Sequence, residues 1–168
     1  MNKTAIIIPS RLKAIRLPNK PLELINNKEM ILHVHDQAIK SEVGEVYVAT
    51  PDEKIIDTVK NSGGNAIKTL NSHQTGTDRI FEAFEQLNIN DVDYIINLQG
   101  DEPLIDANDI INLNTLAIKH NSDIATLACS LDDKNIENQN VVKVICDENI
   151  QINKIGSAKK FLRSIKNE

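Results

Sequence analysis

Short apolar runs alternate along the chain with segments whose apolar residues recur at helical spacing. The first run, from Thr4 to Ile8, is typical of a strand buried on both faces of a parallel sheet, and Pro9 ends it. The pattern predicts further strands at 46–49, 66–67, 94–98, 124–129 and 141–146, and helices at 30–40, from Thr50 to Gly63, around 80–87 and at 106–120. Strand and helix therefore alternate, which predicts a three-layer α/β/α sandwich around a mostly parallel sheet.

Two short segments allow more local predictions. In Thr50-Pro51-Asp52-Glu53 we expect Thr50 to cap the second helix, because Pro suits the first helical position and Glu follows three residues after the cap. Asn26-Asn27 predicts a small turn at the centre of residues 22–28.

Residues 148–168 differ from the rest of the chain. They hold five Lys or Arg against two Glu, and their apolar residues lie at helical spacing: Ile155, Ala158, Leu162 and Ile165. The segment fits an amphipathic helix or a frayed end. We therefore divide the chain into a domain at 1–147 and a divergent tail at 148–168.

Composition excludes several classes of function. A net charge of -5 argues against binding of nucleic acid through its phosphates, and three Phe, two Tyr and no Trp leave few rings for base stacking. No apolar run approaches the roughly 20 residues of a membrane span and no secretory signal is recognisable, so we expect a cytoplasmic protein without a membrane partner. Cys129 and Cys146 lie in apolar runs and are expected to be reduced core residues.

Basic residues gather in the loop that follows the first strand. Pro18 and Pro21 stiffen this loop, and its four cations are Arg11, Lys13, Arg16 and Lys20. Ligands of parallel sheets bind beyond the carboxyl ends of the strands, so these cations predict an anion site, with a polyphosphate as the obvious ligand. A solvated basic loop is the alternative. The loop lacks the glycines and the Gly-Lys-Ser/Thr ending of a Walker loop.

Asp101 also follows a predicted buried strand, between Gly100 and Glu102. A single carboxylate there can share Mg²⁺ with substrate phosphates, because Mg²⁺ takes hard oxygen ligands and keeps several waters. The alternative is an Asp that only forms the turn before Pro103.

A third candidate segment is Thr75-Gly76-Thr77, which combines two hydroxyls, a Gly that allows close backbone approach, and a helix N-terminus. The alternative is that Thr77 only caps the helix that begins at Asp78. The histidines have no spacing typical of a metal site, because His33 and His35 point to different helix faces and His73 has no neighbour at such a spacing.

These motifs resemble those of the sugar cytidylyltransferases, and more narrowly of the 3-deoxy-manno-octulosonate (Kdo) cytidylyltransferases. The matching segments follow the family's order: Ile-Ile-Ile-Pro-Ser-Arg at 6–11, Arg-Leu-Pro-Asn-Lys-Pro-Leu at 16–22, Val-Ala-Thr at 48–50, His-Gln-Thr-Gly-Thr-Asp-Arg at 73–79, Asn-Leu-Gln-Gly-Asp-Glu-Pro at 97–103 and Asn-Val-Val-Lys-Val at 140–144. The order makes the resemblance far more specific than any single motif.

The resemblance implies a Rossmann-like nucleotide-diphospho-sugar transferase fold. It also implies transfer of CMP from CTP to the anomeric hydroxyl of Kdo, with release of pyrophosphate, for lipopolysaccharide synthesis. Carried over by position, the expected catalytic residues Arg11 and Lys20 hold the triphosphate, Arg16 supports their loop and Asp101 binds Mg²⁺. Backbone, hydroxyl and amide groups of several further residues are expected to line the nucleotide or sugar pocket: Ser10, Ala49, Thr50, Thr75, Gly76, Thr77 and Gln99.

Two departures from the family pattern bear on function. Thr75 occupies a position where the family usually has Ser, a change that preserves the hydroxyl. After Asp147 the family continues with a Tyr-Phe-Ser-Arg-type strand and a C-terminal region that supplies sugar contacts, the homodimer interface and a second metal carboxylate, and we expect that region to be missing. The alternatives are an inactive relic that binds CTP only, a structural partner of a separately encoded C-terminal piece, an acylneuraminate-type cytidylyltransferase, or an unrelated α/β phosphate-binding domain.

Overall fold

The computed structural model describes residues 3–13, 17–88, 91–147, 150 and 155–165. The chain divides into two compact units, Met1–Ala125 and Thr126–Glu168. The predicted division after residue 147 therefore falls inside the second unit. In the described part of the chain, no helix has the length and apolar character needed to cross a membrane.

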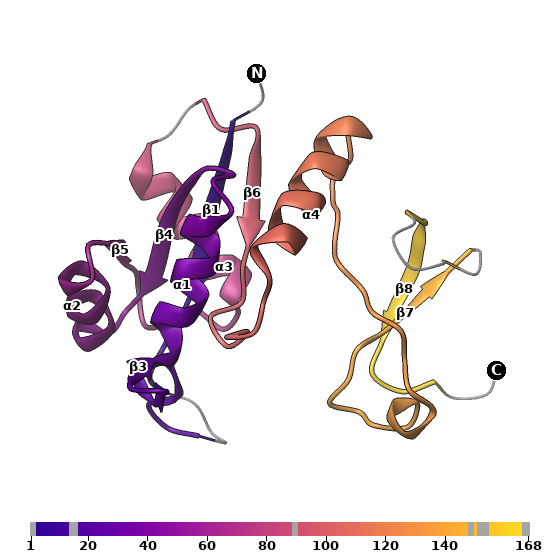
Figure 1. Cartoon of the computed structure of the whole chain (residues 1–168), viewed down its shortest axis with the longest axis horizontal. Helices are drawn as coiled ribbons and strands as arrows, with labels where there is room; N and C mark the ends of the chain where they lie inside the picture. The colour runs from indigo at the N-terminus through magenta and orange to yellow at the C-terminus, as the bar shows by residue number, and fades with distance from the viewer. Residues whose placement is uncertain (1–2, 14–16, 89–90, 148–149, 151–154, 166–168) are drawn as a thin grey trace. The chain divides into compact units, whose positions relative to one another are not determined.

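A parallel sheet of four strands forms the centre of the first unit (Figure 1). The strands lie in the order β5 (Asn65–Lys68), β4 (Glu45–Thr50), β1 (Thr4–Pro9) and β6 (Tyr94–Asn97). In β1, Ile6 pairs with Val46 on one side and with Ile96 on the other. This central place explains the continuous apolar run in β1, because a strand covered on both faces needs no polar side.

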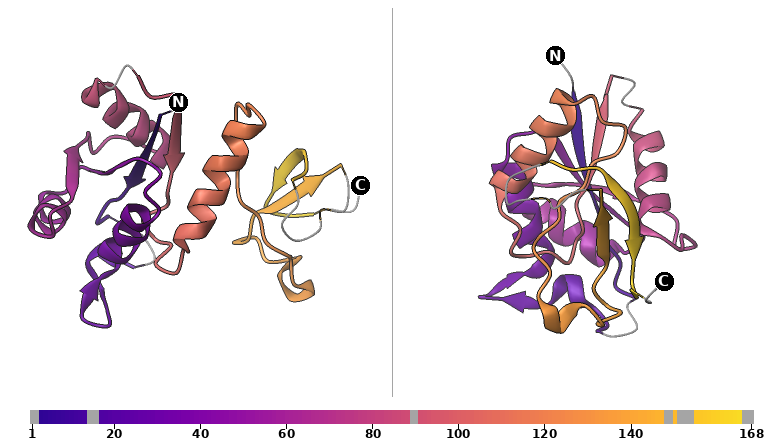
Figure 2. Two further views of the ribbon diagram at one scale, coloured as in Figure 1. Left: turned by 45° about the horizontal axis from the view of Figure 1, so that its top comes forward. Right: turned by 90° about the vertical axis from the view of Figure 1, so that its right-hand side faces the viewer.

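Helices cover both faces of this sheet. α1 (Met30–Lys40), α2 (Glu53–Asn61) and α4 (Ala107–Lys119) supply apolar side chains to the larger core, which also contains Ile6 and Ile8. α3 (Gly76–Leu87) packs on the opposite face (Figure 2), where Ile80 and Ala83 meet Ile7. Alternate residues of β1 thus point into different layers, and the predicted three-layer α/β/α sandwich is confirmed.

The short elements between β1 and α1 contain the predicted turn. A 3-10 helix (Lys20–Leu22) is followed by β2 (Leu24–Ile25) and β3 (Lys28–Glu29), which pair as a hairpin. Asn26 and Asn27 between them have φ values of 50° and 63°. Left-handed backbone at both central positions is what a tight hairpin turn requires, and Asn tolerates it better than most residues.

Two helix starts differ from the prediction. Thr50 is the last residue of β4, and α2 begins at Glu53 with Asp52 at the N-cap position. Thr50 Oγ1 instead accepts a hydrogen bond of 3.2 Å from the Asp52 N–H. In α3 the cap is Thr75, whose hydroxyl exchanges hydrogen bonds with Asp78, so Thr77 is not the cap.

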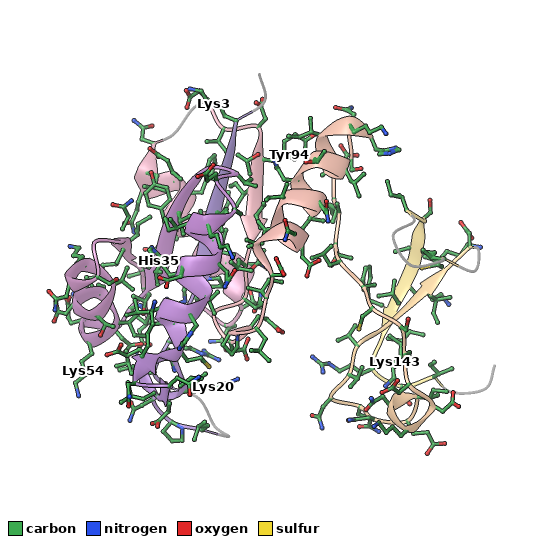
Figure 3. All side chains as sticks on the ribbon, in the orientation of Figure 1. Lys3, Lys20, His35, Lys54, Tyr94 and Lys143 are labelled. Atoms are coloured by element: carbon green, nitrogen blue, oxygen red, sulfur yellow. The ribbon has the colours of Figure 1, made fainter. Side chains whose placement is uncertain are left out.

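The second unit is built around two antiparallel strands, β7 (Lys143–Cys146) and β8 (Ala158–Leu162), preceded by a 3-10 helix at Asp133–Asn135. Lys143 (labelled in Figure 3) is 3% exposed. Its ammonium donates to the carbonyl oxygens of Asn138 and Arg163 at 2.5 and 2.9 Å. These bonds tie the loop before β7 to the end of β8.

Several predictions fail at this end of the chain. Residues 124–129 form no strand, and the described part of 148–168 contains β8 rather than an amphipathic helix. Pairing decides both outcomes: β8 has β7 beside it, whereas 124–129 is not paired with any described strand. Cys129 is exposed and Cys146 only half-buried, so neither is a core residue, although both are free thiols.

We expect Gly44→Ala to destabilise the first unit. A methyl group on Gly44, which lies just before β4, would approach the carbonyl oxygen of Thr4 to 1.8 Å, so the β1–β4 pair would have to shift. Overpacking of this kind costs about 1–3 kcal/mol of unfolding free energy. Chemical denaturation of the two proteins measures the difference, and equal midpoints would contradict the close approach.

His35 on α1 gives the fold an acid-sensitive point. The residue (labelled in Figure 3) is buried, with 6% of its surface exposed, and its Nε2 atom has no hydrogen-bond partner in the described part of the chain. Gly64 lies so close that a Cβ there would be 2.6 Å from Nε2. Burial lowers the pKa of His35 below 6.5, Asp36 raises it and Lys28 lowers it further.

The free energy of unfolding should therefore fall as the pH drops below 6.5. In that range the unfolded chain takes up a proton at His35 before the folded chain does, so acid favours unfolding, and the stabilisation is complete only above this window. Urea denaturation at several pH values should show a shallower acid slope for His35→Gln than for the wild type. Identical slopes would contradict this role of His35.

Candidate functional site

A pocket of about 290 Å³ lies in the first unit, at the carboxyl ends of β1 and β6. Three segments meet there: the loop after β1, the segment that leads into α3, and the loop after β6. Its lining consists of Pro9, Ser10, Arg11, Lys20, Pro21, Met30, His73, Gln74, Thr75, Gly76, Arg79, Gln99, Gly100 and Asp101. This is the edge at which parallel sheets bind ligands.

Backbone contacts fix the loop after β1 at its beginning. The Ser10 N–H donates to the carbonyl oxygen of Ala49 at 2.9 Å, and the Leu12 N–H donates to the Asp52 carboxylate at 2.8 Å. Asn19 returns to the same place, because its N–H donates to the Leu12 carbonyl at 3.0 Å. The two ends of the loop are thereby held together, and Arg11 and Lys20 both reach the pocket.

An ion pair joins the loop after β1 to the loop after β6. Lys20 Nζ lies 3.0 Å from Asp101 Oδ2, and both side chains are partly exposed, so water screens the attraction. Gly100 beside them is required by close packing, since a Cβ there would be 2.9 Å from the Pro9 carbonyl oxygen. Gln99 is fixed by a hydrogen bond of 2.8 Å from its Nε2 to Asn97 Oδ1.

Arg79 is the functional candidate that the motifs alone do not single out. It is 3% exposed, lines the pocket from α3, and donates through Nη1 to Thr69 Oγ1 and, at 3.1 Å, to the Leu70 carbonyl oxygen. Burial lowers the pKa of Arg79 and the positive charge of Arg11 lowers it further, whereas the carboxylates of Asp52 and Glu82 raise it. Two guanidinium groups therefore repel each other at this pocket, which an anion between them would relieve.

The segment before α3 forms the opposite wall with His73, Gln74 and Thr75. Thr75 Oγ1 accepts a hydrogen bond of 3.1 Å from the Asp78 N–H and donates one of 2.7 Å to its carboxylate. His73 Nε2 lies 2.5 Å from Glu82 Oε2 on α3. These contacts give the wall a defined position before any ligand binds.

The predicted site residues divide into three groups. The first group lines the pocket: Ser10, Arg11, Lys20, Thr75, Gly76, Gln99 and Asp101. The second group lies outside its lining: Ala49, Thr50 and Thr77. Ala49 and Thr50 are fully buried and support the loops from behind, through the bonds to Ser10 and Asp52. Arg16 lies outside the described residues.

Ser10 differs from its neighbours in its hydrogen bonding. Its hydroxyl is buried, and no described group forms a hydrogen bond with it. A hydroxyl without a partner is uncommon in an interior, and one that lines a pocket is available to a ligand.

The described residues contain no cluster of three or more His, Cys, Asp or Glu that would hold a metal by itself. Among the described residues that line the pocket, Asp101 is the one carboxylate. One carboxylate fits a Mg²⁺ ion that takes its remaining ligands from phosphate oxygens and water, and does not fit an ion held in an all-protein cage.

Comparison with known proteins places these features in a family. A cytidylyltransferase family model matches residues 5–168. The matched range includes residues 148–168.

Two curated relatives and one solved structure illustrate the likeness. The 3-deoxy-manno-octulosonate cytidylyltransferase of Thermodesulfovibrio yellowstonii is 42% identical over 153 residues, which cover 87% of this chain and 60% of the relative. The 8-amino-3,8-dideoxy-manno-octulosonate cytidylyltransferase of Shewanella halifaxensis is 42% identical over 153 residues, or 89% of this chain and 62% of the relative. A structure of a CMP:2-keto-3-deoxy-manno-octonic acid synthetase complexed with CTP is 35% identical, with a TM-score of 0.84 over 97% of this chain and 65% of that one.

These relatives confirm the narrower resemblance to the Kdo cytidylyltransferases, and the chain spans about 60% of their length. With the family model matched along nearly all of its residues and the family motifs gathered at one pocket, the chain belongs to the cytidylyltransferase family.

Proposed function

We propose that the pocket binds CTP together with Mg²⁺, and that the chain transfers CMP from CTP to Kdo or a closely related sugar acid. The observation that carries the proposal is the gathering of Arg11, Lys20 and Arg79 on one pocket beyond the central strand. A triphosphate requires several fixed cations, and Arg and Lys at strand-end loops provide them. The relatives support the choice of CTP and of the sugar acid through their names.

The roles of the residues follow from their places in the pocket. Arg11 and Lys20 hold the phosphate oxygens from the loop after β1, and Arg79 adds positive charge from α3. Asp101 holds the metal, and bound Mg²⁺ would neutralise charge on the phosphate oxygens. The Ser10 and Gln99 side chains provide polar contacts for the nucleotide or the sugar.

The reaction makes one bond and breaks another. The anomeric hydroxyl oxygen of the sugar acid attacks the α-phosphorus of CTP, the bond between that phosphorus and the bridging oxygen of the β-phosphate breaks, and the hydroxyl proton is lost. Pyrophosphate leaves with the bridging oxygen. Fixed cations lower the barrier because they stabilise the negative charge that develops on the phosphate oxygens. The product would supply lipopolysaccharide synthesis in the cytoplasm.

The proposal is tested by pyrophosphate release from CTP with Mg²⁺, using Kdo and its 8-amino analogue in separate reactions, beside titration of CTP alone. Release with either sugar supports the whole proposal and identifies the sugar. Binding of CTP without release supports the nucleotide site and refutes turnover by this chain on its own. Absence of CTP binding refutes the proposal.

We expect Lys20→Ala to weaken CTP binding by about 10- to 100-fold, the usual range for loss of one hydrogen bond to a charged group. The fold should survive, because the Lys20 side chain is partly exposed. Lys54→Ala is the matched control, since Lys54 is an exposed cation on α2, outside the pocket lining (Figure 3). Calorimetric titration measures both variants, and equal affinity of the Lys20 variant and the wild type would refute the phosphate site.

Asp101→Asn should abolish the gain in CTP affinity that Mg²⁺ gives the wild type. The amide keeps the shape of the side chain but removes the charge that attracts the ion. Titrations with Mg²⁺ and with a chelator give the gain for each protein. Asp109→Asn on α4, where the carboxylate is exposed and outside the pocket lining, should behave as the wild type. An unchanged gain in the Asp101 variant would remove this residue from the metal site.

A further inference from the structure

Glu82 on α3 lies behind the wall that faces the loop after β1. Its side chain is 21% exposed and is absent from the pocket lining. Oε2 accepts a hydrogen bond of 2.9 Å from the Leu70 N–H and lies 2.5 Å from His73 Nε2, while Oε1 accepts one of 2.9 Å from Gln86 Nε2. Three groups therefore converge on one carboxylate.

This carboxylate holds the middle of the segment that forms the wall. Arg79 fixes the start of the segment through Thr69 and the Leu70 carbonyl, and the cap at Thr75 fixes its end. Between these two points lies His73, which lines the pocket and contacts Glu82 through its Nε2 atom. Loss of the carboxylate would leave both the Leu70 amide and the His73 ring without their acceptor.

The contacts also favour the ionised form of the Glu82 carboxylate. Burial raises the pKa of Glu82, but the hydrogen bonds from Leu70, His73 and Gln86 lower it more, so the pKa lies below the ordinary range. An ionised carboxylate accepts hydrogen bonds only, so the His73 Nε2 atom that faces it is the donor of this contact.

We propose that Glu82 is a positioning residue: it orients His73 and holds residues 70–75 as one wall of the pocket, and it thereby sets nucleotide affinity without touching the nucleotide. This inference rests on the proposed binding of CTP. The role of Glu82 in holding residues 70–75 does not depend on which ligand binds.

A double-mutant cycle separates action through His73 from a general effect on the fold. Glu82→Ala and His73→Ala should each weaken CTP binding by about tenfold, and the double variant should lose about as much as either single variant, because both changes remove one interaction. Glu82→Gln keeps an acceptor and should lose less than Glu82→Ala. Glu85→Ala, an equal change of charge at an exposed position of α3, should leave the affinity unchanged.

Hydrogen exchange at the Leu70 amide provides a measurement that needs no ligand. The exchange should be faster in Glu82→Ala than in the wild type and in Glu85→Ala, while amides of β1 keep their protection. If Glu82→Ala does not fold, the same comparison and the same cycle are made with Glu82→Gln.

The outcomes distinguish the two proposals. Faster exchange together with a non-additive loss of CTP affinity supports the role of Glu82. Unchanged exchange at Leu70, or faster exchange with unchanged CTP affinity, overturns it, and additive losses overturn action through His73. If the wild type binds no CTP, the proposed function fails, and the exchange result alone then decides whether Glu82 holds the wall.

Discussion

Because Ile6, Ile7 and Ile8 are fully buried, β1 needs a strand on each side and a helical layer on each face. In the first unit, β4 and β6 are the two neighbouring strands. α1, α2 and α4 cover one face of the sheet, and α3 covers the other. The position of the pocket follows from the same constraint. The loop that leaves the carboxyl end of β1 must emerge between the loops of its two neighbours, so cations of one loop meet the carboxylate of another.

The charges of the pocket are arranged for a ligand rather than for the stability of the free chain. Arg11, Lys20 and Arg79 line the pocket together with Asp101, and the almost completely buried Arg79 donates its hydrogen bonds to the neutral oxygens of Thr69 and Leu70. Burial of a cation costs free energy and the nearby Arg11 guanidinium adds to that cost, while the negative charges of Asp52 and Glu82 offset part of it. An anionic ligand recovers part of this cost on binding, and the cations are already in place when it arrives.

The fold and part of the site could be predicted because they depend on local pattern. The apolar run of β1 and the cations after it are short-range signals, and the rule for parallel sheets brings Lys20 and Asp101 to the same edge. The functions of Arg79 and Glu82 could not be predicted, since each depends on a loop that lies around ten residues away and packs back on α3. The predictions of a strand at 124–129 and of a helix in 148–168 were wrong for a related reason. Strand formation at this end of the chain depends on the pairing of β7 with β8, which local pattern does not reveal.

Asp52 occupies the N-cap position of α2, yet its side chain caps nothing, because its carboxylate accepts the hydrogen bond from the Leu12 N–H. While the loop after β1 is in place, the Asp52 carboxylate bonds Leu12 and does not cap α2. If Leu12 were to move away, the free amides of α2 would offer the carboxylate an alternative partner, and a cap of this kind is worth about 1 kcal/mol. Opening of the loop after β1 would then replace the hydrogen bond between Asp52 and Leu12 by one between Asp52 and α2, so that the carboxylate keeps a partner. Such a replacement would make movement of the loop cost less free energy than its hydrogen bonds alone indicate.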